Sequence, residues 1–461
     1  MPEQVKSPAL FSFSPGSIIE DMDEYEKGNN PITPLAITDY RDIRKVFGIK
    51  QKNRRAHMYI VGKTGTGKST LIENMAVSDI KMGYGIGVID PHGDLAEHIL
   101  DRIPENRIED IVYFNPSDLE FPIAFNLLEK VPLDYHHLVV SGLISVLKKI
   151  WSDFWGPRLE HILRHSLFTL LEYPQSTLLD LPRLLTDKEF RQRAIGYVTQ
   201  PQVRDFWVLE FEKYSAWLKS EAVSPILNKI GQFLTSIPLR NIVGQKENTF
   251  NLRKVMDEGK ILIVNLSKGR LGEDNCALLG AMIVTKLQLA ALSRTDIEED
   301  KRNTFYLYVD EFHNFLTRSF ADILSEARKY GLSMVLAHQY IGQLEEDIRA
   351  SVFGNVGTII SFRVGAEDAG YLAREFSPVF NEMDFTNLAN FHIYLKLMID
   401  GITSKPFSAV TLLPERTDRS YKEQAIALSR QKYTRPRAFV EGDLLRQPYH
   451  LSDDYEQKHL F

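Results

Sequence analysis

The run GKTGTGKS, residues 62–69, has the residue types of a loop that binds phosphate. Its three glycines allow a tight backbone path that points N–H groups inward, and the positive end of a following helix adds to the attraction for an anion. We expect Lys68 to reach the β- and γ-phosphates of ATP and Ser69 to bind Mg²⁺. A glycine-rich turn without a ligand is the alternative. The candidate nucleotide-binding residues of this loop are Gly62, Lys63, Thr64, Gly65, Thr66, Gly67, Lys68, Ser69 and Thr70.

Two adjacent acids, Asp310 and Glu311, follow the apolar run FYLYV. A strand here would deliver both carboxylates to its carboxyl end, where open α/β sheets bind ligands. We expect Asp310 to hold Mg²⁺ through water and Glu311 to orient or deprotonate an attacking water. Adjacent acids after a strand also occur as a solvated turn. The phosphate loop upstream in the same chain favours the catalytic interpretation.

Three further polar residues end strand-like runs. Gln339 ends SMVLAHQ, and its amide could sense the γ-phosphate and position water. Asp90, in VIDPHGDL, is expected near the nucleotide or its magnesium, and Arg363, in IISFRVG, is either a phosphate contact or a structural residue. His92 follows Asp90 closely, but it has no spaced Cys or His partners, so the pattern does not favour zinc.

Arg328 lies in the helix-like stretch DILSEARKYG. If that helix lies at the edge of the sheet, Arg328 is displaced from the nucleotide of its own subunit. It could then enter the site of a neighbouring subunit as an arginine finger. The alternative is a surface arginine that pairs with Glu326 or Asp322.

The elements that must position these residues follow the rhythm of a parallel α/β sheet. From His57 onward, short apolar runs end at polar or glycine-rich turns and are separated by helical stretches. The predicted strands are residues 58–61, 85–89, 110–114, 260–266, 304–309, 333–337, 357–362 and 392–398. They place an α/β domain with a mostly parallel sheet over residues 58–130 and 246–413.

The remaining segments differ in pattern. Residues 131–245 contain all four tryptophans and long amphipathic stretches without a strand-like run, which predicts an inserted all-helical domain. Residues 1–57 contain turn signals such as SPGS and GNN and predict an irregular arm. Residues 414–461 form a charged C-terminal tail with a helical stretch.

Composition excludes several classes of protein. The chain has 461 residues, enough for two or three domains, and its single cysteine, Cys276, excludes an internal disulfide. The N-terminus lacks the pattern of a secretory signal, and no apolar run reaches the roughly 20 residues that cross a bilayer. We therefore expect a cytoplasmic protein without a transmembrane segment. The net charge of −6 disfavours a protein whose surface is coated with nucleic acid, but it permits a local basic lining of a pore.

Six motifs in this order resemble the conjugative coupling proteins of the TraG/TraD type, within the FtsK and HerA superfamily of DNA-pumping ATPases. The motifs are GKTGTGKST, VIDPHGDL, YFNPSD, LYVDEFHNF, ARKYGLSMVLAHQ and YLKLMIDGITSKPFS. The resemblance covers the chain from about Met58 to Arg446. It implies a RecA-like motor domain with ATP and Mg²⁺, a hexameric ring of identical subunits, and DNA moved through a central channel.

The resemblance also assigns roles by motif. Lys68 and Ser69 correspond to the Walker A pair, and Asp310 and Glu311 to the Walker B pair. Gln339 corresponds to the sensor glutamine and Arg328 to the arginine finger. Typical coupling proteins begin with transmembrane helices and HerA proteins with a small β-barrel, and this sequence shows neither. We therefore expect any attachment to a membrane or secretion channel to use a partner protein.

The function that follows is an ATP-hydrolysing motor that translocates DNA. Three alternatives remain: a secretion or pilus-assembly ATPase acting on protein cargo, a HerA-like translocase that processes DNA ends, and an interaction protein that binds ATP as a switch. The Asp310–Glu311 pair disfavours the last, because a protein that only binds ATP needs no catalytic acid.

Overall fold

The computed structural model describes residues 31–39, 44–129, 131–415, 417 and 419–446. It divides into two compact units. The sheet unit takes in Met1–Phe114, Leu252–Gly269 and Cys276–Leu428, and the helical unit takes in Asn115–Asn251, Arg270–Asn275 and Ser429–Phe461, in each case within the described residues.

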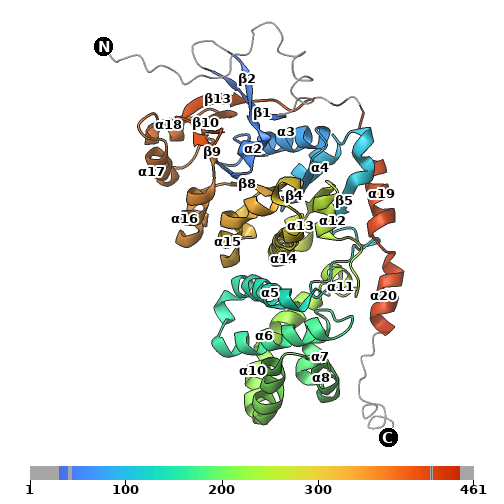
Figure 1. Cartoon of the computed structure of the whole chain (residues 1–461). Helices are drawn as coiled ribbons and strands as arrows, with labels where there is room; N and C mark the ends of the chain where they lie inside the picture. Colours follow the sequence, from blue (N-terminus) through green and yellow to red (C-terminus); the bar gives the residue numbers. More distant parts are fainter. Residues whose placement is uncertain (1–30, 40–43, 130, 416, 418, 447–461) are drawn as a thin grey trace. The chain divides into compact units, whose positions relative to one another are not determined.

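The sheet unit is built on an 11-stranded sheet of order β2-β1-β13-β10-β9-β3-β8-β7-β4-β6-β5 (Figure 1). From β9 to β5 neighbouring strands are parallel, and from β9 to β2 they are antiparallel. The strands are β1 (Ile32–Thr38), β2 (Val46–Lys50), β3 (Met58–Val61), β4 (Gly85–Asp90), β5 (Ile111–Phe114), β6 (Ile261–Asn265), β7 (Phe305–Val309), β8 (Leu332–His338), β9 (Thr358–Ser361), β10 (His392–Lys396) and β13 (Phe407–Thr411). The predicted α/β fold with a mostly parallel sheet is confirmed, and all eight predicted strands are present.

Two strands lie where the sequence predicted an irregular arm, so that prediction is wrong for this part of residues 1–57. β1 pairs with β2 on one side and with β13 on the other. Pro34 lies inside β1, at a register shift between Pro34 and Ala36. Proline is confined to edges and bulges of sheets because it lacks an N–H donor, so its presence hid the strand. Residues 1–30 and 40–43 of the arm lie outside the described residues.

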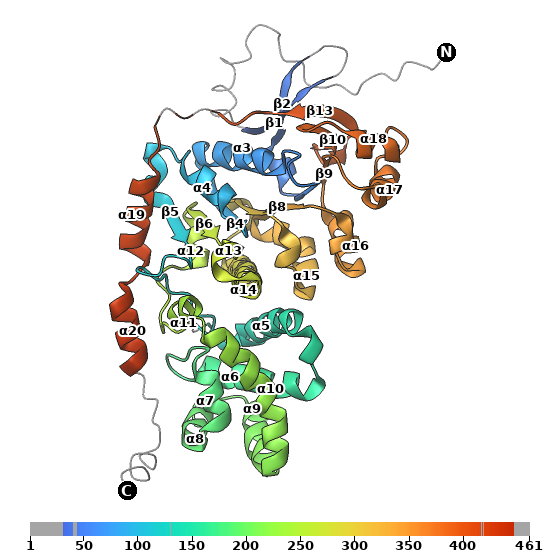
Figure 2. The same ribbon diagram turned by 180° about the vertical axis from the view of Figure 1, so that it is seen from behind.

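Helices cover both faces of this sheet (Figures 1 and 2). α3 (Lys68–Lys81) and α4 (Asp94–Leu100) lie on one face, and α14 (Glu273–Leu292), α15 (Arg318–Glu326) and α16 (Glu346–Asn355) lie on the other. Successive side chains of a strand point to opposite faces, so every second strand residue lies on the face that α3 and α4 cover. The buried residues of this core include Met58, Ile60, Ile86, Val88, Ile261, Ile263, Tyr306 and Tyr308 from strands and Leu71, Ile72 and Met75 from α3. The unit also contains α2 (Gln51–Arg54), α12 (Leu252–Asp257), α17 (Ala366–Glu375), α18 (Glu382–Asn387) and a small pairing of β11 (Met398–Ile399) with β12 (Ile402–Thr403). α13 (Lys268–Leu271) and α19 (Lys422–Tyr433) have residues in both units.

The stretch Glu273–Asp296, which contains α14, is long and apolar enough to cross a membrane, and it is the one such stretch among the described residues. Lys286 interrupts its apolar run, and for this reason the sequence alone predicted no span. In the structure, 61% of its most apolar window is buried inside the protein. Because a buried core helix passes the same test, the stretch is weak evidence for a membrane span.

The regular elements of the helical unit are helices. They include α5 (His136–Ile150), α6 (Pro157–Glu172), α7 (Asp180–Thr186), α8 (Lys188–Ile195), α9 (Pro201–Asp205), α10 (Ala216–Leu234), α11 (Ile237–Val243) and α20 (Arg437–Arg446). Trp207 is fully buried and donates its indole N–H to the Thr169 hydroxyl at 2.7 Å. Residues 429–446 also pack in this unit, because Arg430 donates to Asp118 at 2.7 Å and Thr434 forms a β-bridge with Ile123.

A buried ion pair joins four elements of the sheet unit. Arg54 of α2 lies 2.6 Å from Asp79 of α3, and both side chains are fully buried. Thr33 of β1 donates to the same Asp79 oxygen, and the Tyr308 hydroxyl of β7 donates to the other at 2.6 Å. Arg54 also donates to Thr33 and to the Tyr308 hydroxyl. Burial works to lower the pKa of Arg54, but the charge of Asp79, together with Tyr308, Tyr306 and the hydrogen bond to Asp79, raises that pKa above its ordinary value.

Removing one partner of this pair tests its contribution. Asp79→Ala should lower the stability of the sheet unit by about 3–5 kcal/mol, because it leaves the Arg54 charge buried and uncompensated. Amide hydrogen exchange of β3 and β7 at increasing urea concentration measures this unit alone. Lys52→Ala, which removes an exposed ion pair with Asp400, is the control and should leave the exchange unchanged. An equal loss of stability in Asp79→Ala and Lys52→Ala would contradict the stabilising role assigned to the Arg54–Asp79 pair.

Candidate active site

The predicted site residues follow strands that end at one edge of the sheet. β3 lies between β8 and β9, and its last residue, Val61, is opposite His338 of β8 and Ser361 of β9. β7 and β4 continue the parallel order beyond β8. The edge where β3, β4, β7, β8 and β9 end, here called the site edge, therefore carries the loop 62–69 and the residues that follow the four other strands.

The loop 62–69 needs glycine at its bends, as the sequence predicted. Gly65 and Gly67 have φ angles of +76° and +117°, a region that side-chain-bearing residues rarely adopt. At Gly62 a Cβ atom would lie 2.5 Å from the Cβ of Phe362. α3 begins at Lys68 without a side chain that caps its first N–H groups. These donors are therefore free to bind an anion at the helix N-terminus.

Lys68 is held within the loop. Its side chain is buried, and its ammonium group donates to the Gly62 carbonyl at 2.6 Å and to the Lys63 carbonyl at 3.3 Å. Burial lowers the pKa of Lys68, while the charges of Glu311 and Asp310 oppose that shift. Three charged groups of the predicted site thus lie close enough to interact.

Asp310 and Glu311 are both buried at the end of β7. Glu311 has a φ of +45°, which is unusual for a residue with a side chain, and its N–H donates to Asp310 at 3.0 Å. Burial, and then the charges of Glu311 and Asp90, raise the pKa of Asp310 to about 7, although Lys68 opposes the shift. A group of acids that resists ionisation in this way favours a cation beside it. The Asp310 carboxylate and the hydroxyl of Ser69 are oxygen ligands of the kind that Mg²⁺ prefers, so these residues fit the predicted ion.

Gln339 lies against the catalytic candidate Glu311. Its amide N–H₂ donates to a Glu311 carboxylate oxygen at 3.0 Å. The other Glu311 oxygen lies 3.4 Å from the His313 ring. The structure therefore brings the predicted acid and the predicted amide into direct contact, and it adds a histidine that the sequence did not single out.

Asp90 lies at the site edge, but its carboxylate accepts hydrogen bonds from nearby backbone N–H groups. The side chain is fully buried, and its two oxygens accept the N–H groups of His92 at 2.8 Å and of Ala96 at 2.9 Å. Its contact with a nucleotide stays a prediction. His92 is exposed, and no group of three His, Cys, Asp or Glu that could hold a metal ion occurs in the part of the chain that the structure describes.

The two candidate arginines lie in different places. Arg363 follows β9 at the site edge, where its carbonyl accepts the Lys63 N–H at 2.8 Å and its guanidinium donates to Asn390 at 2.9 Å. Arg328 precedes β8, so it lies at the opposite edge of the sheet from the loop 62–69. Burial lowers the pKa of His57, the residue before β3, and the charge of Arg328 adds to that shift. The structure does not bring Arg328 to the site of its own chain.

The structure describes the side chain of Glu326, one of the two expected partners of Arg328. The Arg328 side chain is exposed and has no ion pair with Glu326 among the described residues. The side chain of Asp322 lies outside the described part of the structure. The alternative of a paired surface arginine therefore gains no support from Glu326.

The sequence did not predict two residues that contact the elements carrying the site. His338 ends β8 beside Gln339, and its ring lies 2.6 Å from the Tyr59 hydroxyl of β3. Phe391 has a φ of +65°, donates its N–H to the Thr66 carbonyl at 2.8 Å and packs against Gly67. A buried histidine directly before Gln339 was the only signal in the sequence, and Phe391 had none.

The parallel sheet, the glycine loop before α3 and the paired acids after β7 define a phosphate-loop NTPase. The family of type IV secretion-system coupling protein DNA-binding domains matches residues 42–377. The match covers most of the chain, so the protein belongs to this family, and the predicted resemblance to coupling proteins is confirmed. No curated protein matches the sequence at a significant level.

Solved structures agree with this assignment. The bacterial conjugative coupling protein TrwB, without its first 70 residues, is 15% identical with a TM-score of 0.61, and the match covers 87% of this chain and 92% of that one. TrwB in complex with ADP and Mg²⁺ matches at 15% identity over 81% of this chain and 90% of that one, with a TM-score of 0.59. VirB4 of Thermoanaerobacter pseudethanolicus is 12% identical with a TM-score of 0.52, over 85% of this chain and 98% of that one. At these identities the likeness shows the fold.

The buried His338 predicts how stability depends on pH. Burial, and then the charge of His313, lower its pKa from 6.5 to about 3, so the folded protein holds it neutral while the unfolded chain protonates it near pH 6.5. Its contribution is complete above pH 6.5 and should be lost at about 1.4 kcal/mol per pH unit as the pH falls toward 3. His338→Gln should flatten this slope in urea unfolding at pH 7, 6, 5 and 4. Tyr59→Phe, which keeps the imidazole, should retain it, and parallel curves for His338→Gln and wild type would contradict the prediction.

Proposed function

We propose that this protein is an ATP-hydrolysing motor that moves DNA. The observation that carries the proposal is the meeting of the glycine loop, the Asp310–Glu311 pair and Gln339 at one edge of the sheet, with Gln339 bonded to Glu311. Membership of a family described as coupling protein DNA-binding domains supports DNA as the cargo. TrwB, solved with ADP and Mg²⁺, supports ATP and Mg²⁺ as the ligands.

The residues of the site edge divide the chemistry among them. The N–H groups of the loop 62–69 and of the start of α3 bind the phosphates, and Lys68 exchanges its loop carbonyls for β- and γ-phosphate oxygens. Ser69 and Asp310 hold Mg²⁺, which neutralises charge on those oxygens. Asp90 and Arg363 complete this group, the first beside the magnesium and the second beside the phosphates.

Glu311 and Gln339 act on the attacking water. The Gln339 amide fixes the Glu311 carboxylate through the 3.0 Å hydrogen bond and leaves its carbonyl oxygen to accept from water. Glu311 then takes a proton from the water as the water oxygen bonds to the γ-phosphorus, and the bond between the γ-phosphorus and the β–γ bridging oxygen breaks, so that ADP leaves. Asp310 would hold Mg²⁺ as a carboxylate, because a cation beside it would oppose the upward shift that burial and the neighbouring acids impose on its pKa.

Arg328 acts in trans in this proposal. It is exposed at the edge of the sheet opposite to its own phosphate loop, so it can serve only the nucleotide of another subunit. The protein therefore works as a homo-oligomer, proposed as a hexameric ring around DNA. We place it in the cytoplasm, attached to a membrane or secretion channel through a partner. The domain bounds 58–130 with 246–413, and 131–245, separate the motor from an inserted helical domain.

A motor for protein cargo is the second candidate. The net charge of −6 favours it, because nonspecific DNA binding usually requires a basic surface. The motor residues would be the same in both cases. The two candidates differ in whether DNA changes the rate of ATP hydrolysis.

The deciding experiment measures steady-state ATP hydrolysis with and without single- and double-stranded DNA. A DNA motor should hydrolyse faster with DNA, and the stimulation should weaken steeply as salt is added, because a few basic side chains carry the contact. Hydrolysis that no form of DNA changes at any salt concentration would favour protein cargo. Lys68→Ala should abolish hydrolysis in both conditions without unfolding the protein.

Glu311→Gln is the matched variant for this experiment. It keeps the size and the hydrogen-bonding capacity of the side chain but cannot take a proton. It should bind ATP as wild type does and hydrolyse it at least roughly 100-fold more slowly. A loss of ATP affinity as large as the loss of turnover would show instead that Glu311 holds the nucleotide or its metal.

Mixing of variants tests the arginine in trans. Arg328→Ala should bind ATP but lose on the order of 10³ to 10⁵ in turnover, the range seen for arginine fingers. When Arg328→Ala and Lys68→Ala chains exchange subunits, some boundaries combine an intact loop with an intact arginine, and part of the activity should return. Full turnover by monomeric Arg328→Ala would show that Arg328 is an ordinary surface charge.

A further inference from the structure

The segment that carries Arg328 has a rigid backbone. It forms the 3₁₀ turn Ala327–Tyr330 and ends at Gly331, whose φ is +71°. The Arg328 carbonyl accepts the Gly331 N–H at 3.2 Å, and the Gly331 carbonyl accepts the N–H of Phe305 at 2.8 Å. Two of the four carbonyl groups from 328 to 331 are thus bonded to the backbone.

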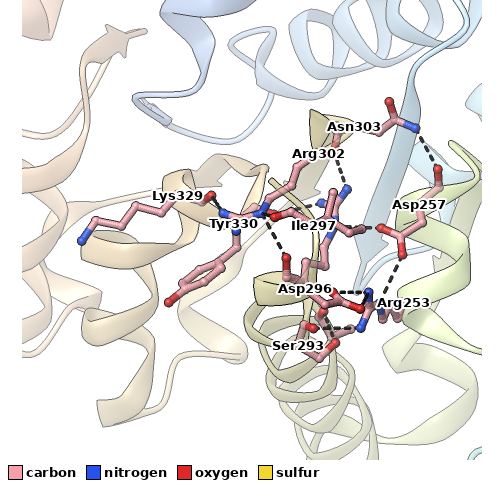
Figure 3. A network of polar contacts seen from close by, with 11 residues as sticks. Arg253, Asp257, Ser293, Asp296, Ile297, Arg302, Asn303, Lys329 and Tyr330 are labelled. Carbon is pink, nitrogen blue, oxygen red and sulfur yellow. Dashed lines mark hydrogen bonds and ion pairs between the residues drawn. The ribbon is translucent and has the colours of Figure 1, made fainter. Parts of the chain in front are cut away.

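Two arginines bind the remaining carbonyl groups. Arg294 donates to the Tyr330 carbonyl at 2.9 Å, and Arg302 donates to the Lys329 carbonyl (Figure 3). The guanidinium of Arg302 also lies 5.5 Å from the centre of the Tyr330 ring. Every carbonyl group from Arg328 to Gly331 therefore has a donor.

Gly331 allows this close approach. A Cβ atom there would lie 3.0 Å from Arg294 Nη1 and 3.3 Å from Arg302 Cβ. A larger residue would push both arginines away from the turn. The glycine and the two guanidinium groups therefore form one fitted arrangement.

Both arginines are anchored in the sheet unit. Arg294 is fully buried, pairs with Asp257 at 2.8 Å and donates to the Asn303 carbonyl at 2.8 Å. Asn303 donates to the Asp257 carbonyl at 2.8 Å, and Arg302 donates to the Ile297 carbonyl at 2.8 Å. Figure 3 shows part of this set, in which Asn303 contacts Asp257 and Arg302 contacts Lys329 in the turn before β8.

The Arg328 side chain contrasts with its backbone. It is exposed and has no hydrogen bond or ion pair with any residue that the structure describes. Each of the two carbonyl groups that the backbone leaves unbonded is bound by one guanidinium group. A backbone held this firmly lowers the entropy cost of presenting one exposed side chain to a ligand.

We propose that Arg294 and Arg302 are positioning residues that hold the 328–331 turn so that Arg328 meets a phosphate of the neighbouring subunit. In this proposal, the two arginines contact neither the nucleotide of their own subunit nor that of the neighbouring subunit. The inference rests on the proposed function, in which Arg328 acts in trans. It adds that the turn is preformed by a guanidinium network before any neighbour is bound.

The test compares Arg302→Ala with Arg253→Ala in the full chain. Arg253 belongs to the same network, where it pairs with Asp257 and Asp296, but it has no contact with Lys329 or Tyr330 (Figure 3). Arg302→Ala should lower kcat roughly 10- to 100-fold, the cost of misplacing a reacting group, and leave KM for ATP nearly unchanged. Arg253→Ala should keep the wild-type kcat. Equal kcat in the two variants would overturn the proposal.

Two further measurements separate positioning from a loss of folding. Arg302→Ala mixed with Lys68→Ala should regain activity, because its own phosphate loop is intact and the second chain supplies a well-placed Arg328. Arg302→Ala added to Arg328→Ala should cause no further loss, because Arg302 acts through Arg328. Absence of rescue, or an additional loss in the double variant, would show that Arg302 acts by stabilising its own subunit. Arg302→Lys, which keeps one donor, should lie between wild type and Arg302→Ala.

Turnover by Arg328→Ala distinguishes failure of the proposed role of Arg328 in trans from failure of the positioning role alone. If Arg328→Ala keeps full turnover, the proposed role in trans fails and the positioning role fails with it. If Arg328→Ala is inactive while Arg302→Ala is as active as wild type, only the positioning role fails.

Discussion

The ion pair between Arg54 and Asp79 is the contact on which the sheet unit depends. A charge removed from water is costly unless an opposite charge and hydrogen bonds compensate it, so the elements that supply the partners must stay together. Those elements are α3, which begins with Lys68, and β7, which ends at the acids of the site. The Tyr308 hydroxyl joins the pair from β7, so α3 and β7, which carry the phosphate loop and the paired acids, are held by the same buried contact. Thr33 of β1 and Arg54 of α2 complete this contact, so these two elements belong to the core of the sheet unit.

The site is a buried group of opposite charges, with acidic side chains at the end of β7 and Lys68 in the phosphate loop. Burial and neighbouring acids raise the pKa of Asp310, and Lys68 opposes this shift from the phosphate loop. The loop carbonyls hold Lys68 near the acids, although its natural ligand is more anionic than a carbonyl group. The protein alone places the acids Asp310, Glu311 and Asp90 near one lysine, Lys68. A nucleotide with its metal would bring negative phosphates to Lys68 and a positive ion to the acids. This explains why acids that are costly to bury are kept at the end of β7.

Much of the fold could be predicted because parallel strands are short, apolar and followed by turns. The end of each strand then placed Lys68, Asp310, Glu311 and Gln339 at one edge, and the contact between Gln339 and Glu311 agrees with that placement. β1 was missed because Pro34 breaks its pattern at a bulge. Long-range partners such as Arg54 with Asp79 leave no periodic signal, since they belong to different elements and depend on the packed geometry. The guanidinium network around the 328–331 turn was missed for the same reason.

Phe391 joins the phosphate loop to the antiparallel half of the sheet. Its N–H binds the Thr66 carbonyl, and its own carbonyl accepts the N–H of Thr411 at the end of β13. Phe391 is therefore a single residue through which backbone hydrogen bonds connect the phosphate loop to β13 and, by strand pairing, to β1. A displacement of the loop on exchange of ATP for ADP would have to stretch these bonds or move β13 with it. The antiparallel strands are thus tied to the loop from the opposite side of β3 to β7.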